Sequence, residues 1–84
     1  MTTQMKLESK LRKVRDSDQF IQGVISFADT EINMQLILNY MEENVDCDDQ
    51  DVSFLAFELS NLRMFPVGSF EWKQGIHDLG LSPL

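Results

Sequence analysis

The sequence is poor in the residues that build most small active sites and cross-linked scaffolds. Its 84 residues include one cysteine, one histidine, four glycines and two prolines. A single cysteine allows no disulfide within the chain, which indicates a reducing compartment. So few glycines and prolines argue against a disordered chain and against a turn-rich all-β fold.

Long apolar runs are also missing from the sequence. No stretch approaches the roughly 20 consecutive apolar residues that cross a bilayer. The first residues contain no apolar segment of the kind that forms a signal peptide. We therefore expect a cytoplasmic protein without a membrane partner.

Basic residues are scarce outside the first 15 positions. Residues 1–15 hold five basic residues against one acid, whereas residues 16–84 hold only Arg63 and Lys73 against thirteen acids. A net charge of −7 repels phosphate, so nucleic acid is not the expected partner. We expect one domain over residues 1–84, with a basic helix or arm at 1–15 and an acidic helical body at 16–84.

Apolar residues recur at helical spacing in five segments, which predicts an all-α fold: a compact bundle of four to five short helices. The expected helices span residues 4–15, 17–28, 30–45, 50–63 and 70–79. Ser69 can cap the last helix, Pro66 stops the one before it, and Gly80 suits a helix end. Whether 17–28 and 30–45 are separate or form one kinked helix stays open.

The segment 30–45 is too apolar for an ordinary surface helix. Its apolar residues fill an arc of about 200°, whereas a one-sided helix needs little more than about 100°. We expect helices 17–28 and 50–63 to cover it on two sides, with the last helix across one end. Helix 50–63 also has a second apolar face, and that face has no assigned cover.

The two ends of the chain each allow two interpretations. Helix 4–15 has an apolar stripe at Leu7, Leu11 and Val14. The favoured interpretation is that it docks on the acidic body, and the alternative is a free basic arm. The apolar tail at 81–84 either packs down or stays free for docking.

Patterns that carry catalysis are weak. His77 adjoins Asp78, but neighbouring residues on a helix do not face each other. Cys47 lies between Asp46 and Asp48, whose charges disfavour the thiolate that a nucleophile needs. We expect no enzyme and no cofactor.

A calcium loop is the most tempting metal site, because Asp46 and Asp48 fit the first and third positions of an EF-hand loop. However, Asp51 stands where the invariant glycine belongs, and Phe57 stands where the bidentate glutamate belongs. These acids are better explained as a helix cap and a helix first turn. We therefore expect no metal.

The leading hypothesis is a small non-enzymatic protein–protein interaction or regulatory module, whose partner is another protein or a second copy in a homodimer. It would act through an apolar helical surface rimmed by acids. The candidate anchors are the aromatic residues Tyr40, Phe54, Phe57, Phe65, Phe70 and Trp72. The candidate acidic edge is Glu42, Glu43, Asp46, Asp48, Asp49 and Asp51.

Two alternatives follow from the uneven charge. The first is a nucleic-acid-linked regulator that uses the basic N-terminal arm. The second is an inhibitor of a nucleic-acid-binding protein, with the acidic edge imitating phosphate.

Overall fold

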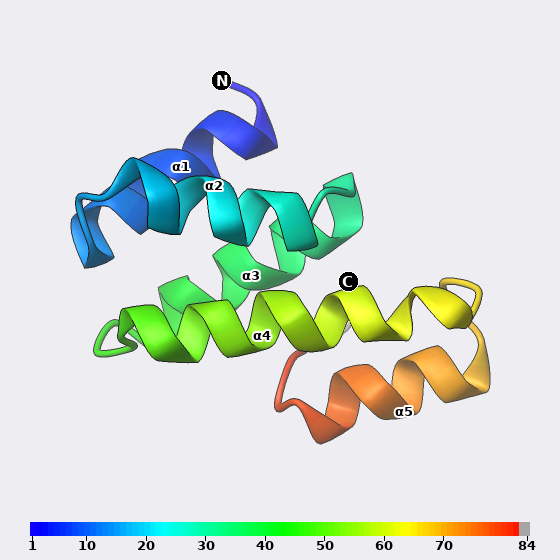
Figure 1. Cartoon of the computed structure of the whole chain (residues 1–84). Helices are drawn as coiled ribbons and strands as arrows, with labels where there is room; N and C mark the ends of the chain where they lie inside the picture. The colour runs from blue at the N-terminus through cyan, green and yellow to red at the C-terminus, as the bar shows by residue number, and fades with distance from the viewer. Residues whose placement is uncertain (83–84) are drawn as a thin grey trace.

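Residues 1–82 are the part of the chain described by the computed structural model, and this part is all-α (Figure 1). Its elements are α1 (Thr3–Val14), α2 (Asp18–Phe27), α3 (Glu31–Glu43), α4 (Asp49–Asn61), the 3₁₀ helix η1 (Leu62–Met64) and α5 (Phe70–Asp78). The predicted all-α fold is confirmed, with α-helix ends within two residues of those expected. Within residues 1–82, no helix has the length and apolar character needed to cross a membrane.

Each α-helix begins at a side chain that accepts a hydrogen bond from the backbone N–H of the third helical residue. These caps are Thr2, Ser17, Thr30, Asp48 and Ser69. Such caps satisfy one of the N–H groups that a helix start leaves free. Because Thr30 starts a new helix after a break at Ala28, α2 and α3 are separate helices.

The end of α5 is closed by the expected glycine. Gly80 has a φ of 77°, which favours glycine, and its N–H donates to the carbonyl of His77. The N–H of Leu81 donates to the carbonyl of Ile76, which completes a Schellman motif. Leu81 is buried, so the tail packs down at this residue, while Pro83 and Leu84 lie outside the described residues.

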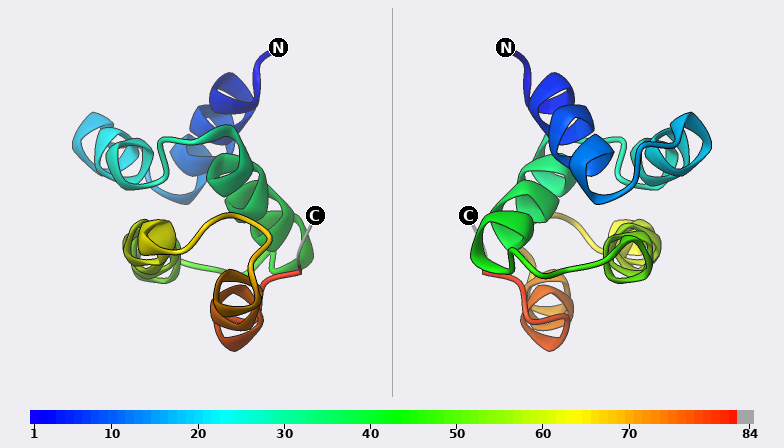
Figure 2. Two further views of the ribbon diagram at one scale, coloured as in Figure 1. Left: turned by 90° about the vertical axis from the view of Figure 1, so that its right-hand side faces the viewer. Right: turned by 90° about the vertical axis from the view of Figure 1, so that its left-hand side faces the viewer.

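The helices pair in alternation along the chain. α1 lies against α3, and α2 lies against α4 in the same direction (Figure 1). α5 lies on the side of α4 away from α2 (Figure 2), with Trp72 and Ile76 buried in the core. The expected packing is therefore corrected: α1 and α4 cover the broad apolar arc of α3, and α2 covers α4.

The basic helix α1 is docked, as the favoured interpretation proposed. Leu7 and Leu11 are both 0% exposed against the α3 side of the core. Arg15 pairs with Asp49 at 2.8 Å, which ties the end of α1 to the start of α4. The apolar stripe of α1 is too short to be stable alone, so burial against α3 is what holds this helix.

Candidate interaction surface

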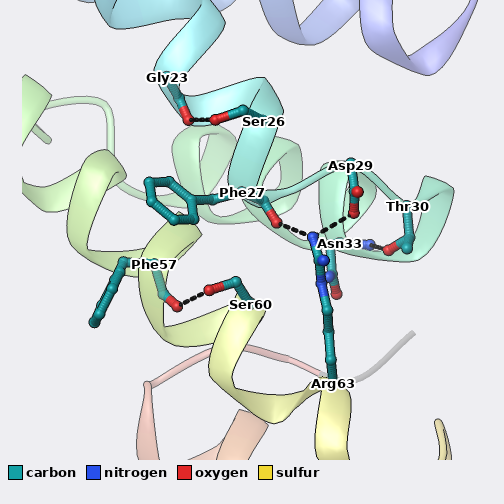
Figure 3. Close-up of polar contacts among 9 residues, drawn as sticks. All are labelled: Gly23, Ser26, Phe27, Asp29, Thr30, Asn33, Phe57, Ser60 and Arg63. Atoms are coloured by element: carbon teal, nitrogen blue, oxygen red, sulfur yellow. Dashed lines mark hydrogen bonds and ion pairs between the residues drawn. The ribbon is translucent and has the colours of Figure 1, made fainter.

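Exposed aromatic side chains gather where α2 and α4 meet. The rings of Phe27 and Phe57 lie edge to face, with centroids 5.7 Å apart (Figure 3). Phe54 precedes Phe57 by three residues on the same helix. Phe27, Phe54 and Phe57 remain 43%, 57% and 48% exposed. Together with Gly23 they are referred to below as the seam surface.

A hollow of about 220 Å³ opens between α2 and α4 on the side of Phe27. Its lining residues are Gln19, Phe20, Gly23, Val24, Phe27 and Ser53. Gly23 leaves the space free, because a Cβ atom added there would meet no atom within 4 Å. An apolar cavity of about 150 Å³ in another protein holds benzene. The hollow is therefore large enough for an aromatic ring.

Arg63 holds the two helices together at the end where Phe27 lies (Figure 3). Its Nη2 donates to the carbonyl oxygen of Phe27 at 2.9 Å and pairs with Oδ1 of Asp29 at 2.6 Å. A cation is favourable at the C-terminus of a helix, where carbonyl groups lack helical partners. This contact joins the C-terminus of α2 to η1, beyond the end of α4.

The seam surface is almost free of charge. Residues 19–28 contain no charged side chain, and residues 52–61 contain only Glu58. The hydroxyls of Ser26 and Ser60 donate to the carbonyls of Gly23 and Phe57, at 2.8 and 2.6 Å (Figure 3). These hydroxyl hydrogens are thus used within their own helices. The result is an apolar face with few charges on a molecule with a net charge of −7, and the Arg63–Asp29 pair and Asp51 lie at its borders.

The other predicted anchors lie away from the seam surface. Trp72 is only 5% exposed and fills the core, so it is not available as a surface anchor. Tyr40 and Phe65 are half-buried, and Phe70 is 78% exposed at the start of α5. The structure therefore brings together two of the six predicted anchors and leaves four elsewhere.

Sequence reasoning missed the contribution of α2 to this site. Phe27 belongs to the broad apolar face of α2, and Gly23 lies in the middle of that helix. Both signals are visible in the sequence, but the expected packing assigned the face of α2 to α3. Since α2 lies along α4 instead, Phe27 comes next to Phe57 and Gly23 opens beside them.

The acidic edge consists of residues with separate local roles. Asp48 and Asp51 form a capping box, with N–H to carboxylate distances of 2.8 and 3.2 Å. Asp49 accepts a hydrogen bond from Arg15, which lowers the pKa of Asp49. Glu42, Glu43 and Asp46 are exposed. The edge meets the seam surface only at the first turn of α4, where Asp51 precedes Phe54 by three residues.

Cys47 and Tyr40 are half-buried near the acidic edge, and their surroundings favour the neutral form of each side chain. Burial, followed by the charge of Asp51, raises the pKa of the Cys47 thiol. The same two causes raise the pKa of Tyr40. Across residues 1–82, no three or more His, Cys, Asp or Glu side chains are grouped so that they could hold a metal ion. This corner therefore supplies neither a thiolate nor a phenolate at neutral pH.

The chain matches no known protein family, and comparisons with curated proteins and with solved structures gave no significant match. What the seam surface offers is apolar contact area and a ring-sized hollow with an uncharged lining. These properties suit binding to another apolar protein face.

Proposed function

We propose that this protein is a small non-enzymatic interaction module that binds another protein through the seam surface. The observation that carries the proposal is that Phe27, Phe54 and Phe57 are exposed where α2 and α4 meet, and that Phe27 lines the hollow at Gly23. Contiguous exposed apolar area commonly marks an interaction site. Aromatic side chains in such sites supply much of the binding energy.

The occupant that fits this surface is an uncharged apolar helical face of a protein. A charged partner would lose hydration on the seam surface without gaining an opposite charge there, because Glu58 is the one charged residue in 52–61 and 19–28 has none. A nonpolar helical face gains instead from burying the exposed rings. The regulatory role that we propose is control of the partner by occupying its apolar face.

The basic helix gives weaker support to the nucleic-acid alternative. α1 is docked through Leu7 and Leu11 and is not a free arm. Arg12 pairs with the carboxylates at 16 and 18, and Arg15 pairs with Asp49. Phosphate would have to compete with these carboxylates for the arginines. The phosphate-imitation alternative is weakened in the same way, because Asp48, Asp49 and Asp51 already have partners within the chain.

The non-enzymatic part of the proposal is supported by the state of the nucleophile candidate. The raised pKa of Cys47 keeps the single thiol of the chain protonated at neutral pH. A lone cysteine without a disulfide partner also suits a reducing compartment, and we propose that the protein acts in the cytoplasm.

A comparison of two matched variants tests the proposed surface. Phe57→Ser removes a ring from the seam surface, and Phe70→Ser removes a more exposed ring from the start of α5. Proteins captured from a host extract by the unmodified chain should be lost with Phe57→Ser and kept with Phe70→Ser. A captured protein, once purified, should shift the amide NMR signals of residues 20–27 and 53–61.

Equal capture by both variants would contradict the proposal, as would signal shifts confined to α1 or to the acidic edge. Circular dichroism of both variants provides the folding control. Both substitutions lie at exposed positions, so neither is expected to unfold the chain.

A further inference from the structure

We infer that the partner of the seam surface is a second copy of this chain, with Phe54 of each copy placed in the Gly23 hollow of the other. This inference rests on the function proposed above and names its partner. It follows from an unusual pairing of features: the same face carries an exposed ring and an empty space of ring size. A face that holds both a projection and its receptor can be complementary to itself.

The positions of three residues around α4 set the geometry of this contact. With about 100° of rotation per residue, Ser53, Phe57 and Phe54 follow one another around the helix surface. Ser53 lines the hollow, Phe57 lies against Phe27, and Phe54 lies on the far side of Phe57 from the hollow. A two-fold axis passing near Phe57 would therefore carry Phe54 of one copy over the hollow of the other, and the reverse.

The charge distribution favours a second copy at this face. Two chains of charge −7 repel each other, so a dimer must form where few charges meet. The lining of the hollow carries no charged side chain, so the two acids that flank Phe54 on its helix, Asp51 and Glu58, would meet no like charge there. A basic partner would instead be drawn to the exposed acids at the end of α3. The seam surface thus selects a neutral face, and the chain itself has one.

The local packing leaves the ring and the hollow available. Phe27 and Phe57 already form an edge-to-face pair, whereas the ring of Phe54 is outside that pair and is 57% exposed. The hollow of about 220 Å³ exceeds the cavity of about 150 Å³ that holds benzene elsewhere. Moving Phe54 into the partner's hollow would bury its ring without displacing another side chain.

Sedimentation equilibrium over a range of chain concentrations tests the dimer. Phe54→Ser removes the projection, and Gly23→Gln fills the hollow with a side chain like those of its neighbours Gln19 and Gln22. Each should weaken self-association by about tenfold or more, the effect expected of a central aromatic contact. Phe70→Ser, the matched control outside the seam surface, should leave the dimer dissociation constant unchanged.

A mixture of the two weakened variants tests the reciprocal arrangement itself. The Phe54→Ser chain keeps its hollow and the Gly23→Gln chain keeps its ring, so a heterodimer retains one of the two contacts. Each homodimer retains neither. The mixture should therefore associate more tightly than either variant alone. In the unmodified dimer, isotope-filtered NMR should detect contacts between the Phe54 ring of an unlabelled copy and Gly23 of a labelled copy.

Three results would overturn this inference. The first is a dimer insensitive to both substitutions, and the second is a mixture that associates no more tightly than its components. The third is a chain that stays monomeric at NMR concentrations. If that monomer still captures a host protein in a Phe57-dependent manner, the inference fails and the proposed function stands. If the capture also disappears, both fail.

Discussion

The two pairs of helices in this protein, α1–α3 and α2–α4, differ in the side chains that they expose. The α1–α3 pair buries Leu7 and Leu11 completely and carries most of the basic residues of the chain on α1. The α2–α4 pair also buries its inner face, at Val24 and Val52 for example, but leaves three phenylalanines partly exposed on its outer face. The first pair therefore resembles ordinary core packing with a charged exterior. The second pair contributes to the core as well, and its exposed rings are what supports the proposed binding surface.

The largest expected effect comes from truncating an apolar side chain in each pair. Leu11→Ala removes a fully buried side chain and should lower the free energy of unfolding by about 2–5 kcal/mol. Phe54→Ala removes a larger but 57% exposed side chain and should lower it by about 1 kcal/mol or less. Urea denaturation of dilute protein measures both. Equal losses would contradict the placement of Leu11 in the core and of Phe54 on the surface.

Two glycines extend the comparison, because replacement by alanine should lower the stability at one position and raise it at the other. An added Cβ at Gly75 would lie 2.5 Å from Cδ2 of Leu62, so the packed Leu62 side chain would have to leave its position. Gly75→Ala should therefore destabilise the chain by about 1 kcal/mol, after subtraction of the gain in helix propensity. At Gly23 the space is open, so Gly23→Ala should stabilise by up to about 1 kcal/mol. Thermal unfolding of both variants gives the two signs.

A smaller effect separates a structural acid from a solvated one at the junction between the pairs. Asp48 caps α4 through the N–H of Asp51, whereas Asp46 is exposed one residue before Cys47. Asp48→Ala should lower the free energy of unfolding by about 1 kcal/mol. Asp46→Ala should change it by less than about 0.5 kcal/mol. Matching losses in urea denaturation would contradict the separate roles described for these acids.

The smallest effect concerns the ion pair that joins the charged end of α1 to α4. The hydrogen bond from Arg15 lowers the pKa of Asp49 in the folded chain. A lowered folded pKa contributes stability above the unfolded pKa, and that contribution is lost as the pH falls through the folded value. Arg15→Gln should raise the pKa of Asp49 in an NMR titration and reduce the loss of stability on acidification. An unchanged titration would show that the pair does not persist in solution.

Much of the fold could be predicted because its signals are local. Ser69, Asp48 and Gly80 act through hydrogen bonds to residues within one turn, so the helix ends were predictable from neighbouring positions. The docking of α1 was predictable in outline, since its Leu7 and Leu11 stripe needs a cover. The helix that covers α1 was not predictable, because several segments have an apolar arc of suitable width.

The candidate site was only half predictable for the same reason. Phe54 and Phe57 lie on the second apolar face of α4, which the helical spacing reveals. Trp72 is aromatic too, but it lies on the face of α5 that packs into the core. Phe27 and Gly23 join the site because α2 packs along α4, which depends on contacts far apart in the sequence.

The sequence by itself therefore determined a fold of four to five helices, the cap and the glycine end of the last one, the uneven charge and the surplus of apolar surface. Those properties depend on the spacing and chemistry of residues within a few turns of each other. Only the tertiary structure decided that α1 pairs with α3 and α2 with α4. Apolar faces are interchangeable in the hydrophobic effect, which has no direction, so shape and packing choose among them. That choice left the three phenylalanines exposed together and opened the hollow at Gly23.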